Sequence, residues 1–158
     1  MSSIKSKLDD VKYVELPPAR AVAFESSGKD VEDTVYFAVT EWLDKNNLRG
    51  TARVYLYNCD PWPTGEGQDY GMGCCATIPE GVVIPDPFKE RRMPGGTYAV
   101  VSDYEGDPSF GWRKMQEIMG DKDCEWEHEE RGCVGLEEHI PKPGGGFHIP
   151  VMLPVKRK

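Results

Sequence analysis

Two adjacent carboxylates and a histidine stand in the segment VGLEEHI near the C-terminal end of the chain. A strand alternates its side chains, so Glu137 and His139 share one face, and Glu138 shares the other with Leu136 and Ile140. A carboxylate among apolar groups is costly to bury unless it is paired, which prepares it to bind a cation. With His139 nearby it could also move a proton. Which of the two glutamates faces a binding site stays open at this point.

Aromatic residues that could stack on a flat ligand are spread along the whole chain. A cation held by a carboxylate can present its other side to such rings. Each ring has an alternative role in core packing. The candidate ligand-binding residues besides the glutamates and His139 are Tyr55, Tyr57, Trp62, Tyr70, Met72, Tyr98, Tyr104, Phe110, Trp112 and Phe147.

The sequence offers little support for other chemistry. Cys124, His128 and Cys133 fit no common zinc spacing, so no metal is expected. The segment PKPGGGFH lacks the Lys-Ser/Thr ending of a phosphate-binding loop. No Ser or Cys nucleophile stands beside an identifiable base. We therefore expect no cofactor.

Composition narrows the classes of protein further. The 158 residues are 39% hydrophobic and 29% charged, which suits a folded domain, and the net charge of −8 disfavours direct nucleic-acid binding. No apolar run reaches the ~20 residues of a membrane span, and the N-terminus lacks a secretory signal. The odd cysteine count, five, argues against a disulfide framework. We expect a cytoplasmic protein, a monomer or weak homodimer, without a membrane partner.

The elements that must position these residues fall into two similar series. In the first, a Pro-Pro corner precedes a strand over 20–24 that ends at Gly28, and a helix follows over 30–47. Asp30 is the expected N-cap, and Val35, Val39, Trp42 and Leu43 form one apolar helical face. Strands over 52–58 and 70–79 complete the series, and residues 80–92 form a connector.

The second series repeats this order. PGGTYAVVSDYEG predicts a corner, a strand and a closing glycine, and a helix follows within 107–123. Strands over 133–141 and 148–155 flank the loop KPGGG. Pro17 corresponds to Pro94 with a shift of 77 residues, and Gly28 to Gly106 with a shift of 78. Agreement of element order over about 70 residues indicates an internal repeat.

This repeat predicts an α+β fold of duplicated β-α-β-β units with pseudo-twofold symmetry. Residues 1–10 are expected to be flexible, and 11–158 to form a single domain, with copy one at about 11–80 and copy two at about 88–156. We expect one antiparallel sheet of about eight strands, two helices on one face and a ligand cleft between the copies.

The segments LPPARAVAFESSG, DYGMGCCATIP, MPGGTYAVVSDYEG and GLEEHIP together resemble the GyrI-like small-molecule-binding domain, over about residues 11–156. This family includes effector-binding domains of AraC-type and MerR-type multidrug regulators. The resemblance implies the same duplicated fold with a central cleft. It places the cleft glutamate of the drug-binding members on Glu137, while His139 stands where the family usually has Tyr. Met72 and Gly73 follow Tyr70-Gly71 where Tyr-Glu is frequent, which predicts a wider pocket.

Three functions follow from these residues and the resemblance. The favoured one is a stand-alone, transcription-regulator-like binding protein for bulky aromatic, often cationic compounds. The second is a hydrolase of cyclopropane-bearing genotoxins, with Glu137 as general base and Trp112 or Tyr98 as positioning residue. The third is a gyrase-inhibitor type of interaction protein.

Overall fold

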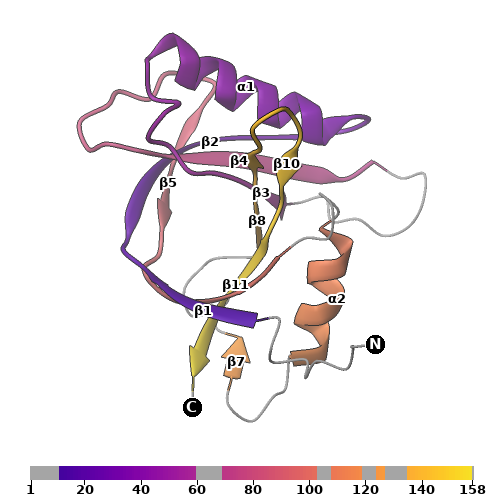
Figure 1. Ribbon diagram of the computed structural model, residues 1–158. Helices are drawn as coiled ribbons and strands as arrows, with labels where there is room; N and C mark the ends of the chain where they lie inside the picture. Colours follow the sequence, from indigo (N-terminus) through magenta and orange to yellow (C-terminus); the bar gives the residue numbers. More distant parts are fainter. Residues whose placement is uncertain (1–10, 60–68, 103–107, 119–123, 127–134, 158) are drawn as a thin grey trace. The chain divides into compact units, whose positions relative to one another are not determined.

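The computed structural model describes residues 11–59, 69–102, 108–118, 124–126 and 135–157 (Figure 1). Within these residues there is no helix long and apolar enough to cross a membrane. The helices are α1 (Val31–Lys45) and α2 (Ser109–Ile118). The strands are β1 (Val11–Leu16), β2 (Ala19–Ser27), β3 (Val54–Cys59), β4 (Gly71–Ile78), β5 (Lys89–Met93), β6 (Gly96–Val101), β7 (Cys124–Trp126), β8 (Leu136–Glu138), β9 (Ile140–Pro141), β10 (Phe147–His148) and β11 (Val151–Arg157).

The chain forms two compact units. Ala19–Met93 make up the central unit, and the terminal unit combines the chain up to Pro18 with the chain from Pro94 onward. Each unit contains one helix and an antiparallel sheet. The expected fold class, α+β with two helices and about eight main antiparallel strands, is confirmed. Residues 1–10, which the sequence predicts to be flexible, lie outside the described part of the chain.

In the central unit, four strands pair in the order β3-β4-β2-β5, and α1 packs on β2 and β4 (Figure 1). Alternate residues of each strand point toward α1 and form a continuous apolar core. Its buried members are Val22, Val31, Val35, Val39, Leu43, Val54, Leu56, Met72, Cys74, Ala76 and Ile78. The other face of this sheet, called the helix-free face below, carries the remaining alternate residues.

Helix α1 begins where the sequence predicts but is not capped as predicted. Asp30 is the N-cap residue, yet its φ of 56° is left-handed and its side chain makes no capping hydrogen bond. An N-cap side chain reaches the first-turn N–H groups from an extended backbone, which explains the difference. The predicted apolar face is largely confirmed, since Val35, Val39 and Leu43 are fully buried. Trp42 is partly buried at the side of the core, against Phe88.

In the terminal unit, the strands pair in the order β1-β6-β11-β8, with β7 against the far end of β11. Helix α2 packs closely on this sheet because Gly111 has no side chain, and a Cβ there would lie 2.7 Å from Val151 Cγ2. The buried core on the helix side contains Val11, Ala99, Val101, Met115, Val151, Leu153 and Val155. The short hairpin β9-β10 completes this unit.

The outermost strand of each unit comes from the sequence repeat that builds the other unit. β1 precedes β2 in the chain but pairs with β6, placing Leu16 opposite Gly96. β5 precedes β6 but pairs with β2, placing Met93 opposite Ala19. The 77-residue shift that relates Pro17 to Pro94 also relates Leu16 to Met93 and Ala19 to Gly96. The two repeats therefore exchange their first strands reciprocally, and in each repeat the exchanged strand precedes the predicted β-α-β-β unit.

This exchange corrects the prediction for residues 80–92. The sequence predicts a connector there, but its last residues belong to strand β5. The strand is an exposed sheet edge with the sequence KERRM, whose charges hide its periodicity and protect the edge from pairing with other chains.

The crossing point of the exchanged strands is tightly packed. A Cβ at Gly95 would lie 2.8 Å from Pro18 N and 2.7 Å from Pro18 Cδ, so even one methyl group requires the backbone to move. We predict that Gly95→Ala lowers the free energy of unfolding by about 1–3 kcal/mol, as overpacked substitutions do. Urea denaturation measures the change. Gly50→Ala, which has no atom within 4 Å of its new Cβ, is the control. Equal stability of both variants would contradict the tight crossing.

Candidate functional site

The helix-free face of the central unit carries two of the predicted ligand-binding aromatics. Val54 and Leu56 point into the helix-side core, so alternation places Tyr55 and Tyr57 on the opposite face. Tyr55 pairs with Cys75 and Tyr57 with Gly73 on β4. Both tyrosines are nearly inaccessible, with 2% and 3% of their surface exposed. The structure therefore brings together these two predicted residues.

Tyr57 belongs to a polar cluster that spans β2, β3 and β5. Its hydroxyl donates a hydrogen bond to Glu25 Oε2 at 2.7 Å. Lys89 Nζ donates to Glu25 Oε1, also at 2.7 Å. The guanidinium of Arg91 lies over the Tyr57 ring, with Cζ 4.2 Å from the ring centroid. A similar arrangement occurs at Tyr55, where Arg53 Cζ lies 5.6 Å from the centroid.

The cluster fixes the protonation states of its members. Burial alone would raise the pKa of Glu25, but hydrogen bonds from Lys89 and Tyr57 and the charges of Lys89 and Arg91 outweigh it and lower that pKa. Burial raises the pKa of Tyr57 far above its usual value, and the neighbouring Cys75 and Glu25 act in the same direction. Glu25 therefore remains a carboxylate, and Tyr57 remains a neutral hydrogen-bond donor.

Gly73 lies directly beneath the Tyr57 ring. A Cβ at Gly73 would overlap the ring, so the tyrosine occupies the space that a side chain would fill. The sequence predicts that Gly73 widens a pocket. The structure shows instead that the ring of Tyr57 fills the gap.

In the terminal unit, Trp112 and Glu137 form a direct contact. Trp112 Nε1 donates a hydrogen bond to Glu137 Oε2 at 2.6 Å. The indole packs against Gly135, where a Cβ would lie 2.6 Å from Trp112 Cη2. Because Gly135 leaves room for the ring, β8 and α2 hold the tryptophan and the carboxylate together. The two residues that the sequence names as general base and positioning residue are thus neighbours.

Strand register shows which face each glutamate occupies. Glu137 pairs with Val151, which belongs to the helix-side core, so Glu137 lies on the α2 side of the sheet. Glu138 follows it and lies on the helix-free face, with 7% of its surface exposed. Strand β8 pairs with β11 in the terminal unit as β3 pairs with β4 in the central unit. By this correspondence Glu137 occupies the position of Leu56, and Glu138 occupies the position of Tyr57.

Tyr98 lies on the helix-free face of the terminal unit. Ala99 and Val101 belong to the helix-side core, so alternation places Tyr98 on the opposite face, where it pairs with Val14 and Pro154. Its hydroxyl donates to the Pro94 carbonyl at 2.7 Å, and only 1% of the residue is exposed. This contact braces the turn between the exchanged strand β5 and β6.

The remaining predicted site residues are dispersed. His139 and Phe147 pack edge to face, with ring centroids 5.4 Å apart. Met72 and Tyr70 belong to the helix side of the central unit, where the Tyr70 hydroxyl bonds Glu32. Trp62 and Tyr104, and the side chain of Phe110, lie outside the described part of the structure.

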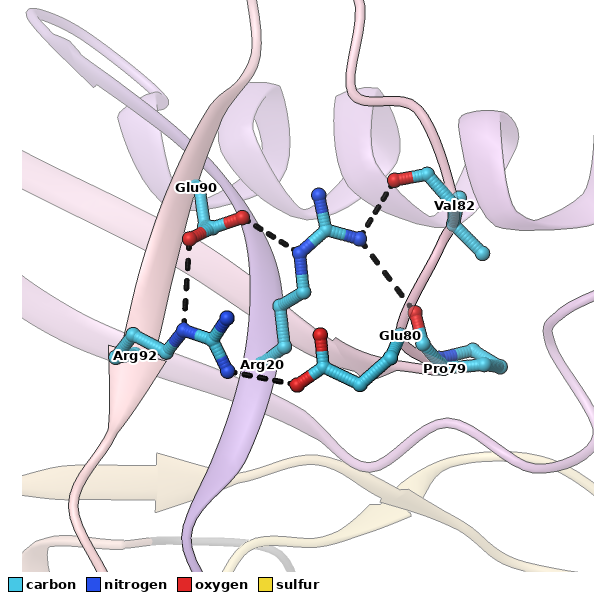
Figure 2. Close-up of polar contacts among 6 residues, drawn as sticks. All are labelled: Arg20, Pro79, Glu80, Val82, Glu90 and Arg92. Carbon is cyan, nitrogen blue, oxygen red and sulfur yellow. Dashed lines mark hydrogen bonds and ion pairs between the residues drawn. The ribbon is translucent and has the colours of Figure 1, made fainter.

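A second polar cluster lies on the helix side of the central unit (Figure 2). Arg20 Nε contacts Glu90 at 2.5 Å, and Arg20 Nη1 donates to the carbonyl of Val82 at 2.6 Å. Arg92 bridges Glu90 and Glu80 beside it. An open groove of about 480 Å³ adjoins this cluster, between residues 81–84 and Phe88. Arg20 uses its donors to fasten the 79–82 segment to β5, which is a structural role.

Sequence reasoning missed the residues Glu25, Lys89 and Arg91. Glu25 stands in a strand-like stretch, and the alternation that buries Val22 on the helix side already placed it on the opposite face. No alternation in the sequence placed Lys89 and Arg91, because the charged segment KERRM does not show the periodicity of a strand.

Comparison with known proteins shows the fold. No protein-family model and no curated protein matches the sequence. The C-terminal domain of EcmrR is similar, with a TM-score of 0.67 and 10% identity over 94% of this chain and 98% of that domain. The EcmrR chain of an EcmrR–DNA complex has a TM-score of 0.70 and 10% sequence identity, and this chain spans 57% of its length. A hydrolase from Listeria innocua has a TM-score of 0.58 and 10% identity, over 93% of this chain and 92% of the hydrolase. The shared fold is consistent with the GyrI-like resemblance.

The lowered pKa of Glu25 leads to a pH-dependent prediction. Its folded pKa lies below the ordinary 4.5, so the stability that its charge contributes is present above that pH and is lost as pH falls through the folded pKa. Glu25→Gln should therefore be less stable than the wild type at pH 7, and the difference in their free energies of unfolding should become smaller below about pH 4.5. Urea denaturation between pH 7 and pH 3 measures it.

The matched control for this experiment is Glu41→Gln. Glu41 is 69% exposed, and its pair with Lys45 lies at the surface, so its loss should change stability little at any pH. A stability difference between Glu25→Gln and the wild type that does not change with pH would contradict the assigned charge state of Glu25.

Proposed function

We propose that this chain is a small-molecule-binding protein that takes bulky aromatic compounds bearing a cationic group, with Glu138 as the residue that binds the cation. The observation that carries the proposal is the register of β8. It assigns Glu138 to the helix-free face, at the position that Tyr57 holds in the central unit. The similarity in fold to the C-terminal domain of EcmrR supports this class of function.

The neighbours of Glu138 on its face of the sheet are apolar. Leu136 and Met152 share this face by alternation and by their pairing, and both are buried. In such low-dielectric surroundings a carboxylate attracts a cation more strongly than it does in water. Apolar neighbours also favour a ligand whose charge is spread over an aromatic frame, because that ligand loses little hydration on entry.

Glu137, on which the family resemblance places the ligand carboxylate, lies on the α2 side of the sheet, where its Oε2 accepts a hydrogen bond from Trp112. The proposal assigns cation binding to Glu138 because it lies on the opposite, helix-free face.

The cationic dye rhodamine 6G tests this assignment. We predict that the wild type binds it and that Glu138→Gln, which keeps the shape but removes the charge, weakens binding about tenfold or more. Glu137→Gln is the matched control and should change the affinity by less than about threefold. Fluorescence anisotropy titration gives the dissociation constants. Absence of binding by the wild type, or an equal loss in both variants, would refute the proposal.

A hydrolase is a second candidate, favoured by the Trp112–Glu137 hydrogen bond. In this alternative Glu137 takes a proton from a water molecule whose oxygen attacks a cyclopropane carbon of the substrate. The ring C–C bond then breaks, the proton passes from Glu137 to the released carbon, and the indole N–H orients the carboxylate. Product formation that is lost in Glu137→Gln and slowed in Trp112→Phe would support it. Binding of the substrate without product formation would contradict the hydrolase and support the binding protein.

A further inference from the structure

The open groove beside the Arg20 cluster, called the Arg20 groove below, has apolar walls. Its volume of about 480 Å³ suits a small organic ligand. Val82 and Ile84, in the segment that follows β4, form one part of the wall, and Phe88, just before β5, forms another. These three side chains are only partly buried against the helix-side core. An apolar ligand that enters the groove therefore removes their remaining surface from water.

Two other aromatic rings hold Phe88 in place. Its ring centroid lies 5.8 Å from that of Phe24 and 5.8 Å from that of Trp42. Phe24 belongs to β2 and Trp42 to α1, so the ring is fixed to both layers of the central unit. Such a wall is preorganised, because binding does not have to restrict a mobile side chain.

Arg20 supplies hydrogen-bond donors to the same groove. Its Nε contacts Glu90, and its Nη1 donates to the backbone carbonyls of Pro79 and Val82. Among the residues that the structure describes, none accepts a hydrogen bond from Nη2. Figure 2 shows Nη2 pointing into the space between Glu90 and Val82, and both of these residues line the groove. Since only 13% of the Arg20 side chain is exposed, water has restricted access to these donors.

The ion pairs around Arg20 favour an uncharged acceptor over an anion. Arg20 and Arg92 contact Glu80 and Glu90, so this cluster contains two cations and two carboxylates. Lys89, which also lines the groove, is itself paired with a carboxylate of the helix-free face. A ligand carboxylate at Nη2 is therefore repelled by Glu90. A carbonyl oxygen avoids this repulsion and still accepts a charge-assisted hydrogen bond.

We propose that the Arg20 groove is a binding site for small, uncharged aromatic carbonyl compounds such as amides. The carbonyl oxygen accepts a hydrogen bond from Arg20 Nη2, and the ring of the ligand lies against Phe88. The site is formed within the central unit and goes beyond the proposed function, because it does not use Glu138 and takes a different class of ligand. Arg20 then has two roles, since Nε and Nη1 fasten the 79–82 segment and Nη2 recognises the ligand.

Cinnamamide and cinnamate test this inference, because they share one flat aromatic frame and differ in an uncharged amide against a carboxylate. An NMR titration of the backbone amide signals gives both the affinity and the place of binding. We expect the wild type to bind cinnamamide with signal changes centred on residues 81–84 and 88–90. Cinnamate should bind about tenfold more weakly. Arg20→Met, which removes the donors, should weaken cinnamamide binding about tenfold or more.

Glu90→Gln separates ligand recognition from the fastening role of Arg20, because the new amide oxygen can still accept the hydrogen bond from Arg20 Nε. Without the carboxylate charge, the preference for cinnamamide over cinnamate should be lost. Arg92→Met is the matched control, since it removes a neighbouring cation that does not line the groove. It should change the cinnamamide affinity by less than about threefold. Urea denaturation shows whether each variant is folded, and if Arg20→Met is not, Glu90→Gln and the place of binding decide.

Several results would overturn the inference. They are absence of cinnamamide binding, signal changes outside the groove segments, a wild-type preference for cinnamate, and unweakened binding by folded Arg20→Met. Rhodamine 6G separates this inference from the proposed function. A wild type that binds rhodamine 6G through Glu138 but does not bind cinnamamide keeps the function and refutes the groove site. Cinnamamide binding at the groove without rhodamine 6G binding supports the groove site and refutes the function.

Discussion

The reciprocal exchange of β1 and β5 between the two sequence repeats is the constraint on which the strand order of each sheet depends. Pro18 and Gly95 meet beside these strands, and their approach leaves no room for a Cβ at Gly95. Tyr98 strengthens the same point through its bond to the Pro94 carbonyl. Because β5 completes the central sheet by pairing with β2, the exchange also brings Lys89 and Arg91 beside Glu25.

Alternation within strands then divides the candidate residues between two faces. The helix side of the terminal unit receives Glu137, whose carboxylate is fixed by Trp112. The helix-free faces receive Glu138 in one unit and the Tyr57 cluster in the other. Glu137 and Glu138 are adjacent in β8, yet the indole of Trp112 orients the first and apolar residues surround the second. The hydrolase hypothesis assigns the function to Glu137, and the binding hypothesis assigns it to Glu138.

Much of the fold could be predicted from the sequence because Pro-Pro and Pro-Gly corners, closing glycines and the apolar face of α1 repeat at a nearly constant shift. The pairing of Tyr55 and Tyr57 on one face followed from period-two alternation. The exchange of strands could not be predicted, because β1 and β5 are next to β2 and β6 in sequence, and local patterns do not reveal that each pairs elsewhere. The contact between Trp112 and Glu137 joins residues 25 positions apart and depends on a missing side chain at Gly135, which no periodic pattern signals.

The central claim is that a cationic aromatic ligand binds at Glu138, and a crystal structure of the protein with rhodamine 6G bound tests it most directly. We expect dye density on the helix-free face of the terminal unit, with a xanthene amine at the Glu138 carboxylate. Density in the helix-side groove between residues 81–84 and Phe88, with the helix-free faces empty, would contradict it.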